Sequence, residues 1–255
     1  MSSADRSADL LAIADRIVAS AGPGEQVEAY VSRGIETDVR VYEGEVEHFV
    51  SAQSEGIGIR VLRDGRTGFA YAGTLDESAI AQVLADARDN VEFGTPDEWA
   101  CMAAPDGVDV VPQELWSDAL AAFATDRKIE LAKELERLTL AADRRVRIDD
   151  ANYSDAAVES AVANTSGIRR AGRENGCYVS VSTMADDGDE TQTGFGFGVG
   201  RSPDQFDLTR PIAVDVNGRR VVDQRVEPSL ATLMKWAAVD NDRTMLFAGE
   251  ITIRP

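Results

Sequence analysis

The chain has 255 residues, of which 44% are hydrophobic, and it carries 26 basic against 45 acidic side chains. This composition is typical of an ordinary folded protein, so disorder is excluded as the main state. The net charge of -19 repels phosphate groups, which argues against direct binding to nucleic acid or to an anionic membrane surface.

The amino-terminal segment does not have the pattern of a targeting signal. Asp5, Asp9 and Asp15 stand where a secretory signal would have a basic start and then an unbroken apolar stretch. No run of 18 apolar residues occurs. Cys101 and Cys177 are far apart in the sequence and suit a reducing compartment. We therefore expect a cytoplasmic protein with neither a membrane span nor a disulfide.

The first 94 residues predict a helix, a β-meander and a second helix. Apolar residues at helical spacing form one face of the first helix: Leu10, Ile13, Ala14, Ile17 and Val18. From Val27 the period changes to two, which predicts five strands at 27–33, 36–44, 45–54, 55–65 and 66–73, separated by Gly34, Gly44, Gly56 and the turn Asp64-Gly65. Thr74 and Glu77 predict a capping box for a helix that continues to Val91.

The second half of the chain repeats this mixture of helix and strands. Residues 95–112 are rich in Gly and Pro and read as a connector. A long helical pattern follows at about 114–143, with Leu131, Leu135 and Leu138 on one face. Strands then return, with turns expected at 164–167, 175–176 and 186–190. We expect an α+β fold in which antiparallel meander sheets pack with helices in two lobes, 1–94 and 113–209.

Alternating glycines mark the strand expected at 191–201. Gly194, Gly196, Gly198 and Gly200 share one of its faces, because side chains alternate between the two faces of a strand. The spacing fails the GxGxxG nucleotide motif, and no helical pattern follows it. A face without side chains allows tight packing against a neighbouring element or forms a floor for an extended peptide. On the second interpretation the four glycines bind peptide and Arg201 anchors a carboxylate.

His48 is the single histidine of the chain, and it lies in a predicted strand. A zinc hydrolase of the HExxH type needs two histidines one helical turn apart, and any Ser/His/Asp triad would depend on this one residue. Residues 186–190 bring four carboxylates together, but their spacing does not match a calcium-binding loop, so we interpret them as a solvated hairpin tip. We predict neither a catalytic nor a metal-binding residue in this chain.

Two stretches of the chain carry a family resemblance. The meander EVEHFVSAQSEGIGIRVLRDGRTGFAYAG, with the helix that follows it, and the later segments YSD and ANTSG together resemble the TldD/PmbA family, whose members are also named modulators of DNA gyrase. The resemblance extends from about residue 8 to residue 209. It is closer to the PmbA/TldE type than to the TldD type.

The resemblance implies a cytoplasmic metallopeptidase system that processes unfolded peptides. In such a system a TldD-type subunit carries a zinc-binding HExxxH motif, and its PmbA/TldE-type partner lacks it. With one histidine this chain holds no HExxxH motif, so we expect no zinc in it and no peptidase activity by itself. The implied partners are a zinc-bearing TldD-type subunit, or a second copy of the chain, and an unfolded peptide.

The sequence departs from the family near residue 210. Family members are longer, and residues from Pro211 onward do not resemble their C-terminal β-rich domain. The acidic excess also stops there, since residues 211–255 hold six acidic and six basic side chains, whereas the first 210 hold 39 and 20. We therefore expect a truncated member whose segment 210–255 has no assigned fold and is either a frameshift product or the unrelated tail of a truncated protein.

A function of another class remains open. The alternative is a non-enzymatic protein-interaction module, that is, an α+β domain that binds a partner protein. Co-purification with a zinc-bearing subunit distinguishes the two hypotheses.

Overall fold

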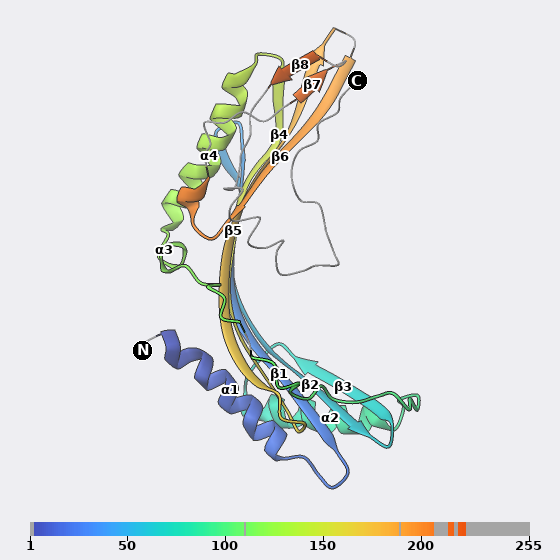
Figure 1. Cartoon of the computed structure of the whole chain (residues 1–255). Helices are drawn as coiled ribbons and strands as arrows, with labels where there is room; N and C mark the ends of the chain where they lie inside the picture. Colours follow the sequence, from blue (N-terminus) through green and yellow to red (C-terminus); the bar gives the residue numbers. More distant parts are fainter. Residues whose placement is uncertain (1–2, 110, 189, 207–213, 217–218, 223–255) are drawn as a thin grey trace. The chain divides into compact units, whose positions relative to one another are not determined.

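The computed structural model describes residues 3–109, 111–188, 190–206, 214–216 and 219–222. The expected α+β class is confirmed, because helices pack with a six-stranded sheet of order β3-β2-β1-β4-β5-β6 (Figure 1). The helices are α1 (Ser3–Ala19), α2 (Glu77–Val91), α3 (Asp118–Ala121) and α4 (Thr125–Ala142), followed by a 3-10 turn, η1 (Pro203–Gln205). The strands of this sheet are β1 (Gln26–Tyr42), β2 (Glu45–Arg63), β3 (Arg66–Ala72), β4 (Val146–Asn164), β5 (Arg169–Asp187) and β6 (Glu190–Gly200). A separate two-stranded sheet contains β7 (Val214–Val216) and β8 (Arg219–Val222).

Strands β1 and β2 are long and continuous where the sequence predicted four shorter ones. The predicted breaks at Gly34 and Gly56 are wrong, because both glycines lie inside a strand. A Cβ at Gly34 would lie 3.2 Å from the carbonyl oxygen of Ala157, and one at Gly56 would lie 2.9 Å from that of Ala72. These two glycines therefore allow a close approach of neighbouring backbone instead of a turn.

Turns occur where the backbone is left-handed. Gly44 and Gly65 have φ angles of 75° and 70°, and they form the hairpin turns that the sequence predicted. The turn predicted at residues 175–176 is wrong, because β5 continues through it. The Asn175 side chain instead binds the backbone of Ser117: it accepts from the Ser117 N–H and donates to the Ser117 carbonyl, both at 2.8 Å. It thus satisfies backbone groups just before α3.

The chain divides into two compact units, each made of three segments. Unit 1 contains residues 1–35, 52–115 and 157–174, and unit 2 contains residues 36–51, 116–156 and 175–255. This differs from the predicted consecutive lobes at 1–94 and 113–209 with a connector at 95–112. The reason is the length of β1, β2, β4 and β5, each of which contributes one part to unit 1 and another to unit 2.

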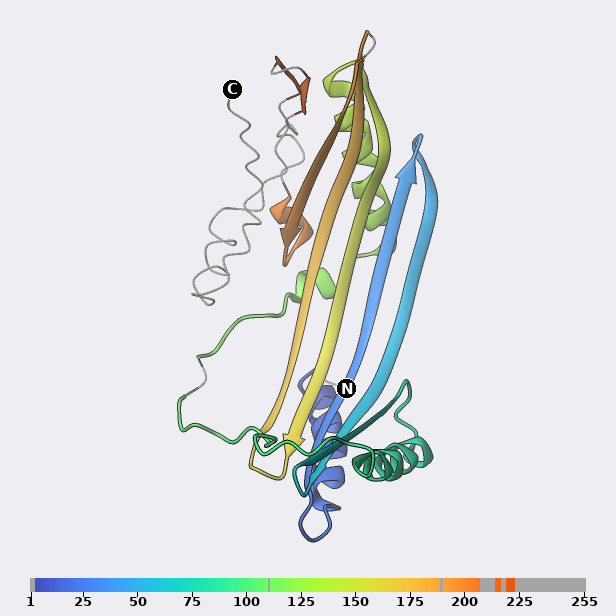
Figure 2. The same ribbon diagram turned by 90° about the vertical axis from the view of Figure 1, so that its right-hand side faces the viewer.

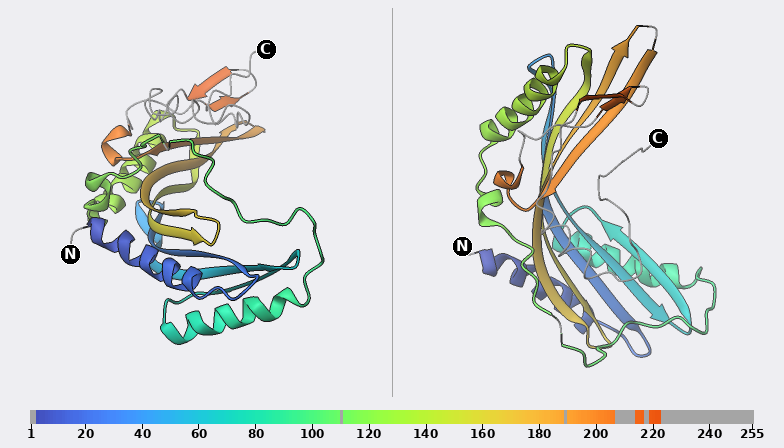
Figure 3. Two further views of the ribbon diagram at one scale, coloured as in Figure 1. Left: turned by 60° about the horizontal axis from the view of Figure 1, so that its bottom comes forward. Right: turned by 45° about the horizontal axis from the view of Figure 1, so that its top comes forward.

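Unit 1 buries α1 and α2 against alternating residues of its strands. Leu10, Ala14 and Ile17 of α1 are buried, as their helical spacing predicted. Helix α2 lies along β3 (Figure 3), where a Cβ at Gly68 would fall 2.1 Å from the carbonyl oxygen of Ala87. The helix therefore packs directly on the backbone of β3, which requires glycine at that position.

The start of α2 differs from the predicted capping box. The helix begins at Glu77, and its N-cap Asp76 makes no side-chain capping bond. The Glu77 carboxylate accepts a hydrogen bond from Arg16 of α1 at 2.7 Å, and Thr74 Oγ1 accepts from the Asp76 N–H. Glu77 therefore links two helices and does not reach back to the N-cap.

Unit 2 packs α4 along one face of its strands (Figure 2). The single helix predicted at about 114–143 is interrupted, because α3 ends at Ala121 and α4 begins at Thr125. Of the predicted apolar face, Leu135 is fully buried, whereas Leu131 and Leu138 are partly buried. The core of unit 2 combines residues of α3, α4, β1, β4 and β5, among them Leu120, Ala132, Leu135, Val39, Val41, Tyr153, Val179 and Val181.

Candidate functional site

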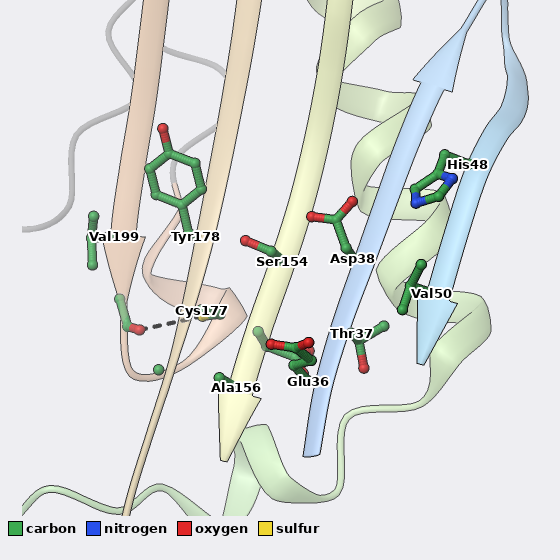
Figure 4. Close-up of a pocket in the computed structure, with 13 residues that line it drawn as sticks. Glu36, Thr37, Asp38, His48, Val50, Ser154, Ala156, Cys177, Tyr178 and Val199 are labelled. Atoms are coloured by element: carbon green, nitrogen blue, oxygen red, sulfur yellow. Dashed lines mark hydrogen bonds between the residues drawn. The ribbon is translucent and has the colours of Figure 1, made fainter. Parts of the chain in front are cut away.

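A pocket of about 610 Å³ lies on the sheet of unit 2 (Figure 4). Strands β1, β2, β4, β5 and β6 contribute its lining residues: Glu36, Thr37, Asp38, His48, Val50, Ser154, Asp155, Ala156, Gly176, Cys177, Tyr178, Val199 and Gly200. All of them belong to unit 2, so this unit alone forms the pocket. Its volume is within the range of sites that hold small ligands or side chains of a partner.

The pairing of β5 with β6 defines the two faces of the sheet at this pocket. Residues that pair directly across an antiparallel ladder place their side chains on the same face. One set of pairs is Cys177 with Gly200, Val179 with Gly198 and Val181 with Gly196; the alternate set is Tyr178 with Val199, Ser180 with Phe197 and Ser182 with Phe195. Val179 and Val181 are buried in the core with α4. Tyr178 and the two phenylalanines therefore lie on the opposite face, which we call the open face.

Three aromatic rings follow one another along the open face. The ring of Tyr178 stacks with that of Phe197 at a centroid distance of 6.0 Å and an interplanar angle of 29°, and the ring of Phe195 lies 5.9 Å from that of Phe197. Phe195 is 56% exposed. We call these three residues the aromatic row, and its Tyr178 end forms one wall of the pocket.

A buried polar network lies between α4 and the sheet. Lys128 Nζ forms an ion pair with Asp155 Oδ2 at 2.7 Å and donates to Thr37 Oγ1 at 3.0 Å. The Tyr153 hydroxyl donates to the same carboxylate oxygen at 2.7 Å. Burial and this bond to Asp155 raise the pKa of Tyr153 far above its ordinary value. The network joins α4 to β1 and β4 and holds Asp155 at the base of the pocket.

Two carboxylates on β1 line the pocket without a salt-bridge partner. Glu36 is exposed and Asp38 is half-buried. Neither forms an ion pair or a side-chain hydrogen bond with another described residue. No Lys or Arg is among the lining residues, and the nearby cation on the same strand, Arg40, is paired with Glu47 at 2.7 Å. The pocket is therefore acidic on its β1 side.

His48 lines the pocket together with Asp38 and Ser154, but the three do not form a catalytic triad. A triad requires the histidine to lie between the serine and the carboxylate. Here His48, Asp38 and Ser154 come from β2, β1 and β4, which are consecutive strands in that order, so the aspartate lies in the middle (Figure 4). Strands are about 4.8 Å apart, which separates His48 from Ser154 by roughly 10 Å. His48 therefore cannot act as the general base of Ser154.

Cys177 is not an activated nucleophile. Burial, together with the neighbouring carboxylates of Asp155 and Asp204, raises the pKa of its thiol to about 12, although the charge of Lys128 acts in the opposite direction. The thiol donates to the carbonyl oxygen of Gly200 at 3.4 Å. It is therefore a core residue that remains protonated near neutral pH.

The strand predicted to carry the alternating glycines is confirmed as β6, and its glycines lie on the face of the sheet that packs in the core. Gly196, Gly198 and Gly200 lie on the core face with Val181, Val179 and Cys177. A Cβ at Gly200 would fall 2.9 Å from Gln205 Oε1. At Gly200 this favours the tight-packing interpretation, since η1 occupies the space where a side chain would be. A role of Gly194, Gly196, Gly198 and Gly200 in peptide binding stays a prediction.

Arg201 follows this strand and makes contacts within the chain. Its backbone N–H donates to Gln205 Oε1 at 2.8 Å, and its guanidinium donates to the carbonyl oxygen of Asn175 at 3.0 Å. The guanidinium thus ties the end of β6 to β5. Its predicted role in anchoring a peptide carboxylate is untested.

The predicted acidic hairpin tip is confirmed for its described residues, because Asp187 pairs with Glu190 and Asp186 with Thr191 at the end of the β5–β6 ladder. Asp186 is paired with Arg147 at 2.7 Å and also accepts from Thr191, and these bonds lower the pKa of its carboxyl group. Among the residues that the structure describes, no cluster of His, Cys, Asp and Glu has the arrangement of a metal site. Within the same ranges, no helix is both long and apolar enough to cross a membrane.

The segments that carried the family resemblance have structural roles. In YSD, Tyr153 and Asp155 form the buried network, whereas Ser154 faces the pocket. In ANTSG, Asn164 Oδ1 accepts from the backbone N–H groups of Ser166 and Ile168, both at 3.0 Å, which builds the predicted turn at 164–167. These residues stabilise the scaffold, and Ser154 and Asp155 also line the pocket.

The sequence reasoning missed Glu36, Asp38 and Tyr178. Each stands in a strand with strict alternation, which shows that it shares a face with its neighbours two positions away but not whether that face is open. The strand order, which brings β1 within two strands of β5, cannot be read from one sequence. No local motif marks these residues.

Comparisons with known proteins match most of the chain to one family. Residues 27–91 match the family model described as PmbA/TldA metallopeptidase domain 1, and residues 118–227 match the PmbA/TldA metallopeptidase central domain. The second match continues beyond residue 209, where the resemblance was expected to end. The charge change near residue 210 therefore does not mark the end of family-like sequence.

Two curated relatives agree with this assignment. The chain is 23% identical over 241 residues to the Metalloprotease PmbA of Escherichia coli O157:H7, covering 94% of this chain and 52% of that protein. It is also 23% identical over 219 residues to the Metalloprotease PmbA homolog of Haemophilus influenzae, covering 86% of this chain and 48% of that protein. The chain thus spans about half the length of the curated relatives it matches.

Solved structures show the same fold. A protein from Thermotoga maritima described as a modulator of a DNA gyrase matches with a TM-score of 0.64 and 18% identity, over 86% of this chain and 47% of that one. TldE from Thermococcus kodakarensis matches with a TM-score of 0.64 and 17% identity, over 76% of this chain and 43% of that one. The order of the strands, the two matched domain models and these relatives agree, and the chain belongs to the PmbA/TldD family of metallopeptidase-related proteins.

Proposed function

We propose that this chain is a non-catalytic, PmbA/TldE-type subunit that holds unfolded peptides in the cytoplasm for a zinc-bearing TldD-type subunit. The observation that supports this most directly is the composition of the pocket. The family is related to metallopeptidases, but the pocket residues are not arranged like a catalytic site. The strand β1 separates His48 from Ser154, and the thiol of Cys177 is buried. Among the described residues, the lining groups of this pocket can bind a ligand, whereas its histidine, serine and thiol are not arranged for nucleophilic catalysis.

The open face is suited to an unfolded peptide. It combines exposed carboxylates, a serine hydroxyl and an aromatic row over several adjacent strands. A mixture of polar and aromatic groups binds varied side chains, whereas a deep apolar cleft would select one small molecule. Peptide binding is therefore the expected role of this surface.

Reconstitution tests the proposal. The chain is purified alone and after co-expression with a TldD-type protein that carries HExxxH, and zinc content and cleavage of an unfolded, fluorogenic peptide are measured in both samples. We expect substoichiometric zinc and no cleavage with the chain alone, and a stable complex with cleavage in the co-expressed sample. Stoichiometric zinc with cleavage by the chain alone would contradict a non-catalytic role.

The same experiment addresses the alternative of a protein-interaction module. A chain that folds but neither associates with the zinc-bearing subunit nor changes its cleavage rate would favour that alternative. A second copy of the chain is then one of the partners to test. The gyrase description of one structural relative also suggests a test with DNA. With a net charge of -19 we expect no shift of a DNA duplex at low salt.

We also propose that the chain is a truncated family member, and sequencing of its gene tests this. A frameshift stays a prediction, but the family match continues to residue 227, so we place it beyond that residue and not at the charge change near residue 210. Sequencing the locus and translating all three frames past codon 255 distinguishes the possibilities. A β-rich continuation in another frame supports the frameshift, whereas its absence from every frame contradicts it.

A further inference from the structure

The acidic side of the pocket has charge that no other described residue neutralises. Glu36 and Asp38 lie two residues apart on β1, on the same face of that strand, and both line the pocket. Three cations close to them in the sequence or the network are already paired: Arg33 with Glu159, Arg40 with Glu47 and Lys128 with Asp155. The two carboxylates are thus available to a cation from outside the described chain.

The opposite side of the pocket is aromatic. Tyr178 of β5 lines it, and its ring is supported by stacking on Phe197. Strand β4 lies between β1 and β5 and contributes the Ser154 hydroxyl (Figure 4). With strands about 4.8 Å apart, the carboxylates and the tyrosine ring are separated by roughly 10 Å, enough for one extended side chain to lie over β4.

A long cationic side chain satisfies both walls at once. Its aliphatic stem packs against an aromatic ring, its charge interacts with the face of that ring, and its head group pairs with a carboxylate. An anionic side chain would meet two carboxylates and no cation. We propose that this pocket selects Lys or Arg side chains of an unfolded peptide, with Glu36 and Asp38 as the charge partners and Tyr178 as the stacking surface. The proposal rests on the peptide-binding role given above and specifies its substrate class.

Fluorescence anisotropy with the full chain tests this. Three labelled, unstructured peptides of equal length carry four Lys, four Glu or four Gln at the same positions in a Gly/Ser background. We expect the Lys peptide to bind at least about tenfold more tightly than the Gln peptide, and the Glu peptide not to bind. Raising the salt concentration weakens the Lys complex, because charge pairs at an open surface are screened.

Matched variants separate the pocket from the overall charge of the chain. Glu36→Gln with Asp38→Asn removes two charges inside the pocket, and Asp89→Asn with Glu98→Gln removes two from exposed sites in unit 1. We expect at least about tenfold weaker binding of the Lys peptide for the first pair and less than twofold for the second. Tyr178→Leu should weaken it about threefold or more, as expected for the loss of a cation–π contact.

Several results would overturn the proposal. Equal losses in the two double variants would show that the peptide responds only to net charge, and equal affinity for the Lys and Glu peptides would show that charge is not selected. Binding of none of the three peptides would have the same consequence. Association with a zinc-bearing subunit is measured separately, so that the role as a subunit can stand when this selectivity fails.

Discussion

Lys128 on α4 is paired with Asp155 on β4 at 2.7 Å, and both side chains are only 11% exposed. Removing one partner of such a pair leaves an uncompensated buried charge, which costs about 3–5 kcal/mol. The pair also connects the helix to the strand that carries Ser154 and lies below the pocket. We therefore regard it as a main determinant of how α4 and the sheet of unit 2 are held together.

Lys128→Met tests this role. We expect a loss of about 3–5 kcal/mol in the free energy of unfolding, measured by urea denaturation, because Asp155 is left without its cation. Lys133→Met is the control, since Lys133 is 37% exposed and lies 3.5 Å from the exposed Glu45, a geometry worth about 0–1 kcal/mol. Equal losses in the two variants would refute the importance of the buried pair.

Gly68 tests how closely α2 packs on β3. A Cβ there would fall 2.1 Å from the Ala87 carbonyl oxygen and 2.5 Å from the Val91 nitrogen, both of which are backbone atoms. Gly68→Ala should therefore destabilise the protein by about 1–3 kcal/mol or more in thermal or urea unfolding. Gly73→Ala, where nothing lies within 4 Å of the added Cβ, should be neutral or slightly stabilising. The reverse order of effects would show that the helix does not rest on β3.

The two cysteines should differ strongly in reactivity. Cys101 is exposed, whereas Cys177 is buried with a pKa raised to about 12. We expect one thiol to react rapidly with an aromatic disulfide reagent at pH 8 in the native protein, and the second only after unfolding. Cys101→Ser should remove the rapid phase and Cys177→Ser should preserve it. A rapid phase that survives Cys101→Ser would show that Cys177 is accessible.

Acid should weaken the protein partly through Asp143. Hydrogen bonds from Arg145, first through its side chain and then through its backbone N–H, lower the pKa of Asp143 from 3.8 to about 2. Because the folded-state pKa is lowered, its contribution to stability is present above about pH 3.8 and is lost as the pH falls towards 2. Asp143→Asn should therefore reduce the change in urea midpoint between pH 5 and pH 2.5.

The control for this acid effect is Asp149→Asn, which changes an exposed carboxylate with no ion pair to another described residue. Its urea midpoints should follow those of the unmodified chain across the same pH range. A change in pH dependence as large as that of Asp143→Asn would contradict the specific role of the Arg145 contact.

Substitutions on the glycine face of β6 distinguish a packing role of these glycines from a role in peptide binding. Gly196 and Gly198 lie opposite Val181 and Val179, which are buried in the core of unit 2. We expect Gly196→Val combined with Gly198→Val to lower the free energy of unfolding by about 1–3 kcal/mol per site. Thr193→Val, on the opposite face of the strand, should have little effect. A double variant of unchanged stability that no longer binds peptide would instead support the predicted peptide floor.

The local pattern of the sequence was sufficient for the class of the fold and for many of its elements. The helical spacing of Leu10, Ala14 and Ile17 led to a buried helix face, and Asp64-Gly65 led to a hairpin turn, because these features depend on residues close together in the chain. The meander and the YSD and ANTSG segments carried the family resemblance, which the matched family models confirm. Local periodicity therefore determined which segments are helices and strands.

Only the tertiary structure decided where the strands end and which residues meet. Glycines stand at all four predicted strand breaks, but they have different roles. Gly34 and Gly56 permit a neighbouring backbone to approach, whereas Gly44 and Gly65 form turns. A single sequence cannot separate these uses, because the close contacts come from residues distant in the chain. For the same reason the sequence did not predict the pocket: Glu36 and Tyr178 line it together only because β4 lies between β1 and β5.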